Sequence, residues 1–322
     1  MVPIYSVVIP HYDDCARLIR CLDALMPQIG QDGEVIVADN GTPGGLPDAV
    51  TDRPRVAVVT EPVKGAGPAR NAGVRAARGR WILFVDADCV PAPDWVRAAL
   101  SAARPNAITG GPVGLFDETP GPRSGAEAFE TVFAFRMRSY FEDEGFLGTG
   151  NLVTARAVFD RVGGFRAGVS EDKEWTRRAA GAGVELRFDD TMRVDHPTRA
   201  DWAALSGKWR RLTSETWLTE RGTAGTRRRW ALKAAAMPLS AAAHSAEVLR
   251  HPALSPAEKA RALATLHRLR WARMGWMAAA PFTAVPPEEP DAADGPLPGD
   301  APVALHLPSK DSATGVGFRE AS

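Results

Sequence analysis

Short apolar runs alternate with amphipathic stretches in the N-terminal third of the chain. The runs that predict strands are Tyr5–Ile9, Glu34–Ala38, Val56–Thr60 and Trp81–Val85. The last of them has no polar alternation, which indicates a strand buried on both faces, as in a parallel sheet. Between the runs, apolar residues at helical spacing reach about Leu25, and proline with several alanines favours a helix over 68–78. This alternation predicts an α/β fold with a mostly parallel sheet flanked by helices.

The pattern is looser between residues 90 and 200. The elements expected there are a helix over 94–103, a strand over 107–113, a mobile Gly- and Pro-rich loop over 114–125, one helix over 127–141, short helices near 155–162 and 171–180, and short strands at 184–188 and 192–194. His196 and Pro197 follow directly after the last of these strands.

A C-terminal helical extension is expected over 201–280, broken by glycines and prolines that include Pro238. Six of the nine tryptophans lie there: Trp202, Trp209, Trp217, Trp230, Trp271 and Trp276. Tryptophan beside Arg227–Arg229 is typical of a helix at an anionic membrane surface. The alternative is that the tryptophans pack the helices onto the rest of the protein while the arginines face water. Both interpretations remain open at this stage.

Composition divides the chain into three zones. Basic and acidic residues balance at 39 each, but 201–280 is basic, whereas 281–322 is acidic and rich in proline. We therefore expect a catalytic domain over 1–200, a basic Trp-rich extension over 201–280, and a disordered tail over 281–322.

Neither a leader sequence nor an apolar segment long enough to span a membrane is evident. The three cysteines have no metal-ligand spacing, which fits a reducing cytoplasm. We therefore expect a cytoplasmic protein, peripheral on the inner face of the membrane if residues 201–280 bind lipid. No nucleic-acid partner is expected.

Asp86 and Asp88 directly follow the buried strand Trp81–Val85. The carboxyl ends of strands are where open α/β sheets bind ligands. If the backbone stays extended, both side chains leave on the same side and can converge on one cation. Such hard oxygen ligands suit Mg²⁺ or Mn²⁺ shared with phosphate oxygens. The alternative is that the two residues only shape a turn.

Two other segments add to this edge of the sheet. Asp39 ends the second predicted strand, close to where a nucleotide base lies in doubly wound sheets. The Gly-rich segment 64–73 opens a helix and contains Lys64 and Arg70, which suits an anionic ligand. The Walker A and Gly-x-Gly-x-x-Gly patterns are absent after the first strand, which argues against an ATPase or a dehydrogenase.

A series of segments in a fixed order strengthens this interpretation. They lie at 7–10, 37–41, 64–73, 86–88, 148–151, 162–165 and 171–172. In sequence and order they resemble the motifs of family 2 glycosyltransferases, over about residues 4–200. The resemblance implies the GT-A fold, a UDP- or GDP-linked nucleotide-diphospho-sugar donor, Mn²⁺ or Mg²⁺, and inversion at the anomeric carbon. Together with the basic Trp-rich segment over 201–280, it suggests a saccharide or lipid-linked acceptor at the membrane face, as in cell-surface polysaccharide or glycolipid assembly.

The resemblance also implies roles for individual residues. The donor-binding set is Pro10, Tyr12, Asp39, Lys64, Arg70 and Asp86. Asp88 is the expected direct metal ligand, Asp86 contacts the ribose or the metal through water, and His196 is a candidate third ligand or diphosphate contact. Gly150 and Asn151 belong to the acceptor-side loop.

The implied catalytic pair is Asp172, as the base, with Glu171 beside it. Chemistry independently requires these groups, because an attacking hydroxyl must lose its proton to a carboxylate and a leaving diphosphate needs a cation.

Residues 40–45 depart from the family pattern, because they lack the second carboxylate that many relatives carry there. The preference for base and sugar is therefore less defined than the metal site. Two alternatives stay open: a non-catalytic nucleotide-sugar-binding protein on the same fold, and a sugar nucleotidyltransferase. The second lacks its expected Gly-rich loop after the first strand, where His11 and Tyr12 stand instead.

Overall fold

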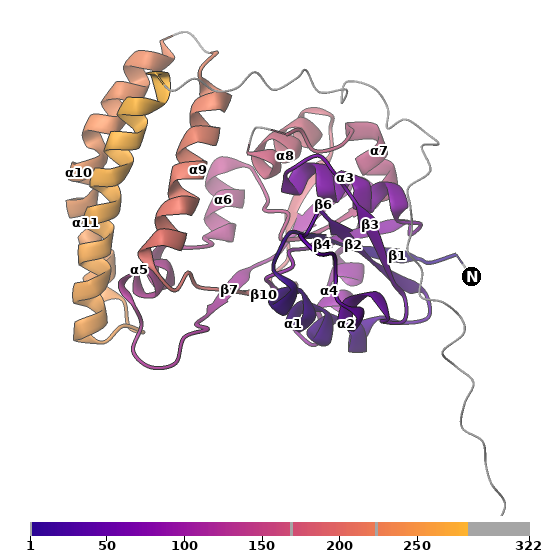
Figure 1. The fold of residues 1–322 in the computed structure, drawn as a ribbon. Helices are drawn as coiled ribbons and strands as arrows, with labels where there is room; N and C mark the ends of the chain where they lie inside the picture. The colour runs from indigo at the N-terminus through magenta and orange to yellow at the C-terminus, as the bar shows by residue number, and fades with distance from the viewer. Residues whose placement is uncertain (1, 168–169, 223–224, 283–322) are drawn as a thin grey trace, which may run out of the picture.

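The computed structural model describes residues 2–167, 170–222 and 225–282 (Figure 1). Its centre is a seven-stranded sheet with the order β3-β2-β1-β4-β8-β6-β9. All neighbouring strands pair in parallel except β8, which is antiparallel to both β4 and β6. The predicted mostly parallel sheet, flanked by helices and followed by a helical region, is thus confirmed.

The four strands predicted first are present with small shifts at their ends. They are β1 (Tyr5–His11), β2 (Gly33–Asp39), β3 (Val56–Thr60) and β4 (Trp81–Val85). Their side chains alternate between two cores. Val7 and Ile9 pack on one face with helix α1 (Cys15–Leu25), whereas Val8 and Phe84 pack on the other with α3 (Ala66–Ala76). Burial on both faces explains the continuous apolar runs.

Helices complete both faces of the sheet. They are α2 (Asp48–Thr51), α4 (Trp95–Ala102), α7 (Arg156–Val162) and α8 (Glu171–Gly181), with a 3-10 helix at Met26–Gln28. Trp175 of α8 is fully buried against Phe159 and Phe165. Cys21 and Cys89 are also buried, and all three cysteines are free.

The prediction of one strand over 107–113 was wrong. The chain forms β6 (Ala107–Gly110) in the main sheet and then β7 (Val113–Phe116) in a second, three-stranded sheet with the order β5-β10-β7. The change of sheet occurs at Gly111, where a Cβ atom would lie 2.1 Å from the Met192 carbonyl oxygen. β10 (Val194–Pro197) is the central strand of this sheet and pairs with β7 on one side and with β5 (Val90–Pro91) on the other.

Three further expectations between residues 114 and 200 need correction. The predicted loop over 114–125 is shortened by β7, and the strand β8 (Asn151–Ala155) was missed. The single helix over 127–141 is two, α5 (Gly125–Phe133) and α6 (Met137–Glu144), because Phe135 has a left-handed backbone with φ of 51°. The last two strands of this part are β9 (Glu185–Phe188) and β10, so His196 lies within a strand.

The C-terminal region contains three long helices, α9 (Trp202–Glu220), α10 (Thr226–Arg250) and α11 (Pro256–Ala279), before a 3-10 turn at Ala280–Phe282. Pro238 lies inside α10 without ending it, contrary to the prediction. Packing outweighs the local cost of proline, since α10 and α11 lie side by side (Figure 1) and bury Ala241 and Val248 against Leu266. No helix within the described ranges is long and apolar enough to cross a membrane.

Packing accounts for most tryptophans of this region. Trp217 and Trp230 are buried with ring centroids 5.3 Å apart, and Trp230 Nε1 donates to the Met277 carbonyl at 2.7 Å. Trp271 differs, being exposed. The predicted boundaries at residues 200 and 280 stay predictions, and the acidic tail lies outside the described residues beyond Phe282.

Candidate active site

Asp86 and Asp88 leave the end of β4 in a turn rather than in an extended segment. The Cys89 N–H donates to the Asp86 carbonyl at 3.0 Å, which closes this turn. The two carboxylates consequently point to different partners: Asp86 Oδ1 lies 2.6 Å from Arg70 Nη2, and Asp88 Oδ2 lies 3.0 Å from His196 Nε2. The expectation that an extended backbone directs both to one point is therefore wrong for this structure.

Arg70 of α3 is the centre of an acidic cluster. Its side chain is only 4% exposed and contacts Asp86, Glu171 at 3.2 Å and Asp172 at 4.0 Å. Burial opposes its charge, yet these three carboxylates raise the pKa of Arg70. One cation thus holds three acids from two distant segments of the chain.

Gly150 makes room for this cluster. A Cβ atom at Gly150 would lie 2.7 Å from Asp86 Oδ2, so a side chain there would displace the carboxylate.

The following residue has another role: Asn151 is 1% exposed, accepts from Trp95 Nε1 at 2.8 Å, and donates to the carbonyls of Pro112 and Met192. Its amide joins the two sheets and does not face an acceptor, contrary to the predicted acceptor-side role.

Asp172 lies in the first turn of α8 and has a raised pKa. Burial is the largest cause; Arg70 opposes it and the Glu171 charge adds to it, which brings the pKa of Asp172 to about 6. The Thr149 hydroxyl donates to Asp172 Oδ1 and orients the carboxylate. A carboxyl group that titrates near neutral pH is suited to accept a proton in a reaction.

Asp88 and His196 form a pair that could hold a cation. His196 Nδ1 lies 2.6 Å from the Pro197 carbonyl and Nε2 lies 3.0 Å from Asp88 Oδ2, so in this structure Nε2 donates to the carboxylate. A cation that takes the place of the Nε2 proton would be shared between the imidazole and the carboxylate. Burial opposes ionisation of Asp88, but the hydrogen bond from His196 keeps its pKa low. A carboxylate suits Mn²⁺ or Mg²⁺, and of these two ions the transition metal Mn²⁺ accepts an imidazole more readily.

Asp86 does not join that pair, because Arg70 holds it. Within the described ranges, no group of three His, Cys, Asp or Glu side chains gathers at distances suited to a metal.

The predicted nucleotide side is a separate group of residues at the ends of β1 and β2. Asp39 is 5% exposed and accepts from the Thr42 N–H at 3.1 Å, the Thr42 hydroxyl at 2.5 Å and His11 Nδ1 at 3.2 Å. Burial works against its ionisation, but the bonds from Thr42 lower the pKa of Asp39. Sequence reasoning missed His11 and Thr42; the only signal was their position beside predicted strand ends.

The other predicted donor residues lie around this group. Pro10 is buried in β1, beside Ala38. Tyr12 is 53% exposed, and Lys64 Nζ lies 4.0 Å from its ring centroid and 2.7 Å from the Asn40 carbonyl. Tyr12 and Lys64 therefore form one edge, which a planar ligand could contact.

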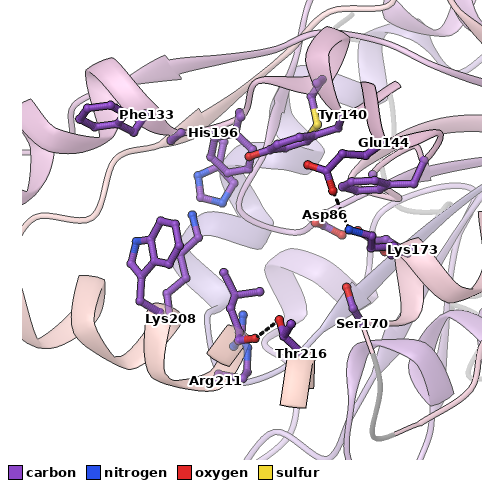
Figure 2. Close-up of a pocket in the computed structure, with 18 of the residues that line it drawn as sticks. Asp86, Phe133, Tyr140, Glu144, Ser170, Lys173, His196, Lys208, Arg211 and Thr216 are labelled. Atoms are coloured by element: carbon purple, nitrogen blue, oxygen red, sulfur yellow. Dashed lines mark hydrogen bonds and ion pairs between the residues drawn. The ribbon is translucent and has the colours of Figure 1, made fainter. Parts of the chain in front are cut away.

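A cavity of about 1000 Å³ opens on the other side of the carboxylates, between the sheet and the C-terminal helices (Figure 2). Asp86, Asp88, Asp172 and His196 contribute to its wall. The remaining wall is aromatic and charged, with Phe135, Tyr140, Phe146, Lys173, Lys208, Trp209 and Arg273 among its residues. Figure 2 shows Lys208, Arg211 and Thr216 projecting from α9. Sequence reasoning did not identify these residues.

Comparison with known proteins agrees with this arrangement. The model of the family "Glycosyl transferase family 2" matches residues 6–168. Glycosyltransferase AglE of Haloferax volcanii is 27% identical over 220 residues, which cover 65% of this chain and 71% of AglE. Succinoglycan biosynthesis protein ExoO of Rhizobium meliloti is 34% identical over 105 residues, 32% of this chain and 30% of ExoO.

A solved structure, S. aureus TarS 1–349 in complex with UDP-GlcNAc, overlaps 84% of this chain and 92% of that one, with 15% identity and a TM-score of 0.47. The family model covers just over half of the chain; it includes Arg70, Asp86 and Gly150, whereas Glu171 and Asp172 lie beyond its end. The chain belongs to family 2 of the glycosyl transferases.

Proposed function

We propose that this glycosyltransferase moves a sugar, with inversion, from a UDP- or GDP-linked donor to a hydroxyl group of a saccharide or lipid-linked acceptor. The observation that carries the proposal is the placement of Asp172 in the cavity wall, with a pKa of about 6 and beside the Arg70 cluster. In an inverting transfer the base stands across the sugar from the leaving group, so one carboxylate suffices.

Asp172 accepts the proton of the attacking hydroxyl in this proposal. Thr149 fixes the orientation of Asp172 Oδ1. Glu171 is a positioning residue: it binds Arg70 at 3.2 Å, and its charge raises the pKa of Asp172. Fixed groups of this kind lower the reorganisation that accompanies proton transfer.

Asp88 and His196 would hold Mn²⁺ or Mg²⁺ through Oδ2 and Nε2. Such a cation, when bound, stabilises the charge that develops on the leaving diphosphate. Asp86 would then contact the donor from its place on Arg70.

The nucleotide would occupy the side of Asp39, Tyr12 and Lys64. Asp39 Oδ2 accepts one bond from the Thr42 N–H and retains capacity for a base N–H. The Tyr12 ring is exposed and backed by Lys64, which suits stacking on a base.

The direct test incubates the purified chain with UDP- and GDP-sugars and Mn²⁺, and measures release of the nucleoside diphosphate. We expect release with one class of donor, its loss in Asp172→Asn, and loss of Mn²⁺-dependent nucleotide binding in Asp88→Ala. The proposal fails if no donor is turned over and Asp88→Ala binds nucleotide as well as the parent protein does.

We propose in addition that α10 contacts an anionic membrane surface. Leu232, Leu239 and Leu249 are exposed on it, and Arg227–Arg229 are exposed at its start. Apolar side chains next to arginines suit a lipid surface with negative charge. Flotation with phosphatidylglycerol vesicles tests this: we expect salt-sensitive binding that Leu232→Ser with Leu239→Ser abolishes, and no binding at low salt would refute it.

A further inference from the structure

The helical side of the cavity carries more positive than negative charge. Lys208 Nζ and Arg199 Nη1 lie 3.1 and 2.8 Å from the same oxygen of Glu130 on α5. The backbone N–H of Arg199 donates to the other carboxylate oxygen of Glu130 at 2.8 Å. Glu130 is 1% exposed, so this one buried carboxylate holds two cations, and the charge of Arg199 also acts on Asp88, whose pKa it lowers.

Arg273 of α11 adds a further positive charge, which has no ion pair with the described residues. Its guanidinium lies 4.8 Å from the Trp209 ring centroid, and its Nε is buried without a hydrogen-bond partner in the described part of the chain. Burial, followed by the nearby cation Arg270, lowers the pKa of Arg273 to about 10, and the group stays charged at neutral pH. A buried cation of this kind is costly unless a ligand supplies negative charge.

Aromatic rings connect this charge to the predicted metal side. The Phe135 ring centroid lies 4.5 Å from that of His196 and 4.9 Å from Lys208 Nζ. Trp209 follows Lys208 on α9, and its buried Nε1 also has no hydrogen-bond partner among the described residues. All of these side chains line the same cavity as Asp172. An acceptor with one hydroxyl near Asp172 could therefore lie on these rings and reach Lys208 and Arg273.

We infer that Arg199, Lys208 and Arg273 form a subsite for a phosphate group carried by the acceptor saccharide. This inference rests on the proposed function, because it names the substrate class of the acceptor side. The three cations exceed the charge of Glu130 by two, which matches the charge of about −1.5 to −2 on a phosphate monoester better than the single charge of a carboxylate. Guanidinium groups also bind phosphate oxygens in pairs, and Trp209 Nε1 offers another donor.

The test is calorimetric binding to the full chain saturated with UDP and Mn²⁺, so that the donor side is filled. The probes are glucose 1-phosphate, glucuronate and glucose. We expect glucose 1-phosphate to bind most tightly, and Lys208→Met and Arg273→Gln to weaken it about tenfold each. Arg273→Lys keeps the charge without the paired donors and should give an intermediate affinity. Arg261→Gln, exposed on the same helix and outside the cavity wall, is the matched control.

Several outcomes would overturn the inference. Equal binding of the three probes would remove the phosphate preference, and inorganic phosphate binding as tightly as glucose 1-phosphate would show an anion site unrelated to a saccharide. Weaker binding of UDP itself in Lys208→Met and Arg273→Gln would assign the cations to the donor. Nucleoside diphosphate release without any acceptor, measured in parallel on the parent protein, reports the proposed function separately.

Discussion

The two sides of the cavity use the same arrangement with opposite charges. On the sheet side, the buried cation Arg70 is surrounded by Asp86, Glu171 and Asp172. On the helical side, the buried anion Glu130 is surrounded by Arg199 and Lys208. In each case the central group is almost fully buried, and its partners outnumber it. The excess charge is therefore negative where a proton and a cation are to be bound, and positive where we place a phosphate.

The largest effect on stability is expected from replacing Arg70, the buried cation on the sheet side. Arg70→Met leaves Asp86, Glu171 and Asp172 close together without the cation they share, and should lower the free energy of unfolding by about 3–5 kcal/mol. Urea denaturation at pH 7.5 measures this. Arg75→Gln on the same helix is the control, because its partly exposed pair with Glu61 should contribute under about 1 kcal/mol. A loss no larger than that of the control would show that Arg70 does not hold the cluster.

Asp172→Asn is expected to affect catalysis more than stability. The amide keeps the shape but cannot accept the proton, so kcat for transfer should fall by about 10²–10⁴-fold while the dissociation constant for the nucleotide changes little. Steady-state kinetics and nucleotide titration measure the two quantities. Transfer at an undiminished rate would contradict the role of Asp172 as the base.

Replacing Glu130, the buried anion on the helical side, should lower the free energy of unfolding by less than replacing Arg70. Glu130→Gln leaves two like charges together, Arg199 and Lys208, whereas Arg70→Met leaves three, and the Gln amide oxygen can still accept from one of the cations. We expect a loss of about 1–3 kcal/mol in urea denaturation. A loss equal to that of Arg70→Met would show that Arg70 and Glu130 stabilise the fold equally.

The smallest effect concerns pH. The base acts in its ionised form, so activity should rise with pH through about 6 and reach a plateau above it, following the pKa of Asp172. Glu171→Gln removes the neighbouring charge that raises this pKa, and should move the acidic limb of kcat/KM to lower pH. A profile that does not move would mean that Glu171 does not tune the base.

Much of the sheet could be predicted from the sequence, because strands such as Trp81–Val85 are buried on both faces and leave a continuous apolar run. Strand β8 was missed, since its five residues follow a Gly-rich loop and gain their partners from β4 and β6, far away in the chain. The break between α5 and α6 was missed because it depends on one left-handed residue, Phe135.

In the candidate site, too, some residues could be named from the sequence, whereas the contacts between them could not. Asp39, Asp86, Asp88 and Asp172 could be identified because each lies at a strand end or a helix start within a recognisable motif. The divergence of Asp86 from Asp88 depends on Arg70 and His196, which neither pattern nor spacing connects to them. Glu130 of α5 pairs with Arg199 and Lys208, which are far from it in the sequence, so only the tertiary structure shows these contacts.

The position of α5 in the chain has a consequence for biosynthesis. This helix lies between strands of the two sheets, yet Phe129 and Ala128 are buried in a core that includes Leu266 and Leu269 of α11. During synthesis α5 therefore leaves the ribosome long before α11 is made. Its apolar face stays exposed to solvent until the C-terminal helices can pack on it. A chain that ends at residue 200 would retain that uncovered face, and we expect a larger fraction of it than of the full chain to sediment as aggregate when the two are expressed side by side.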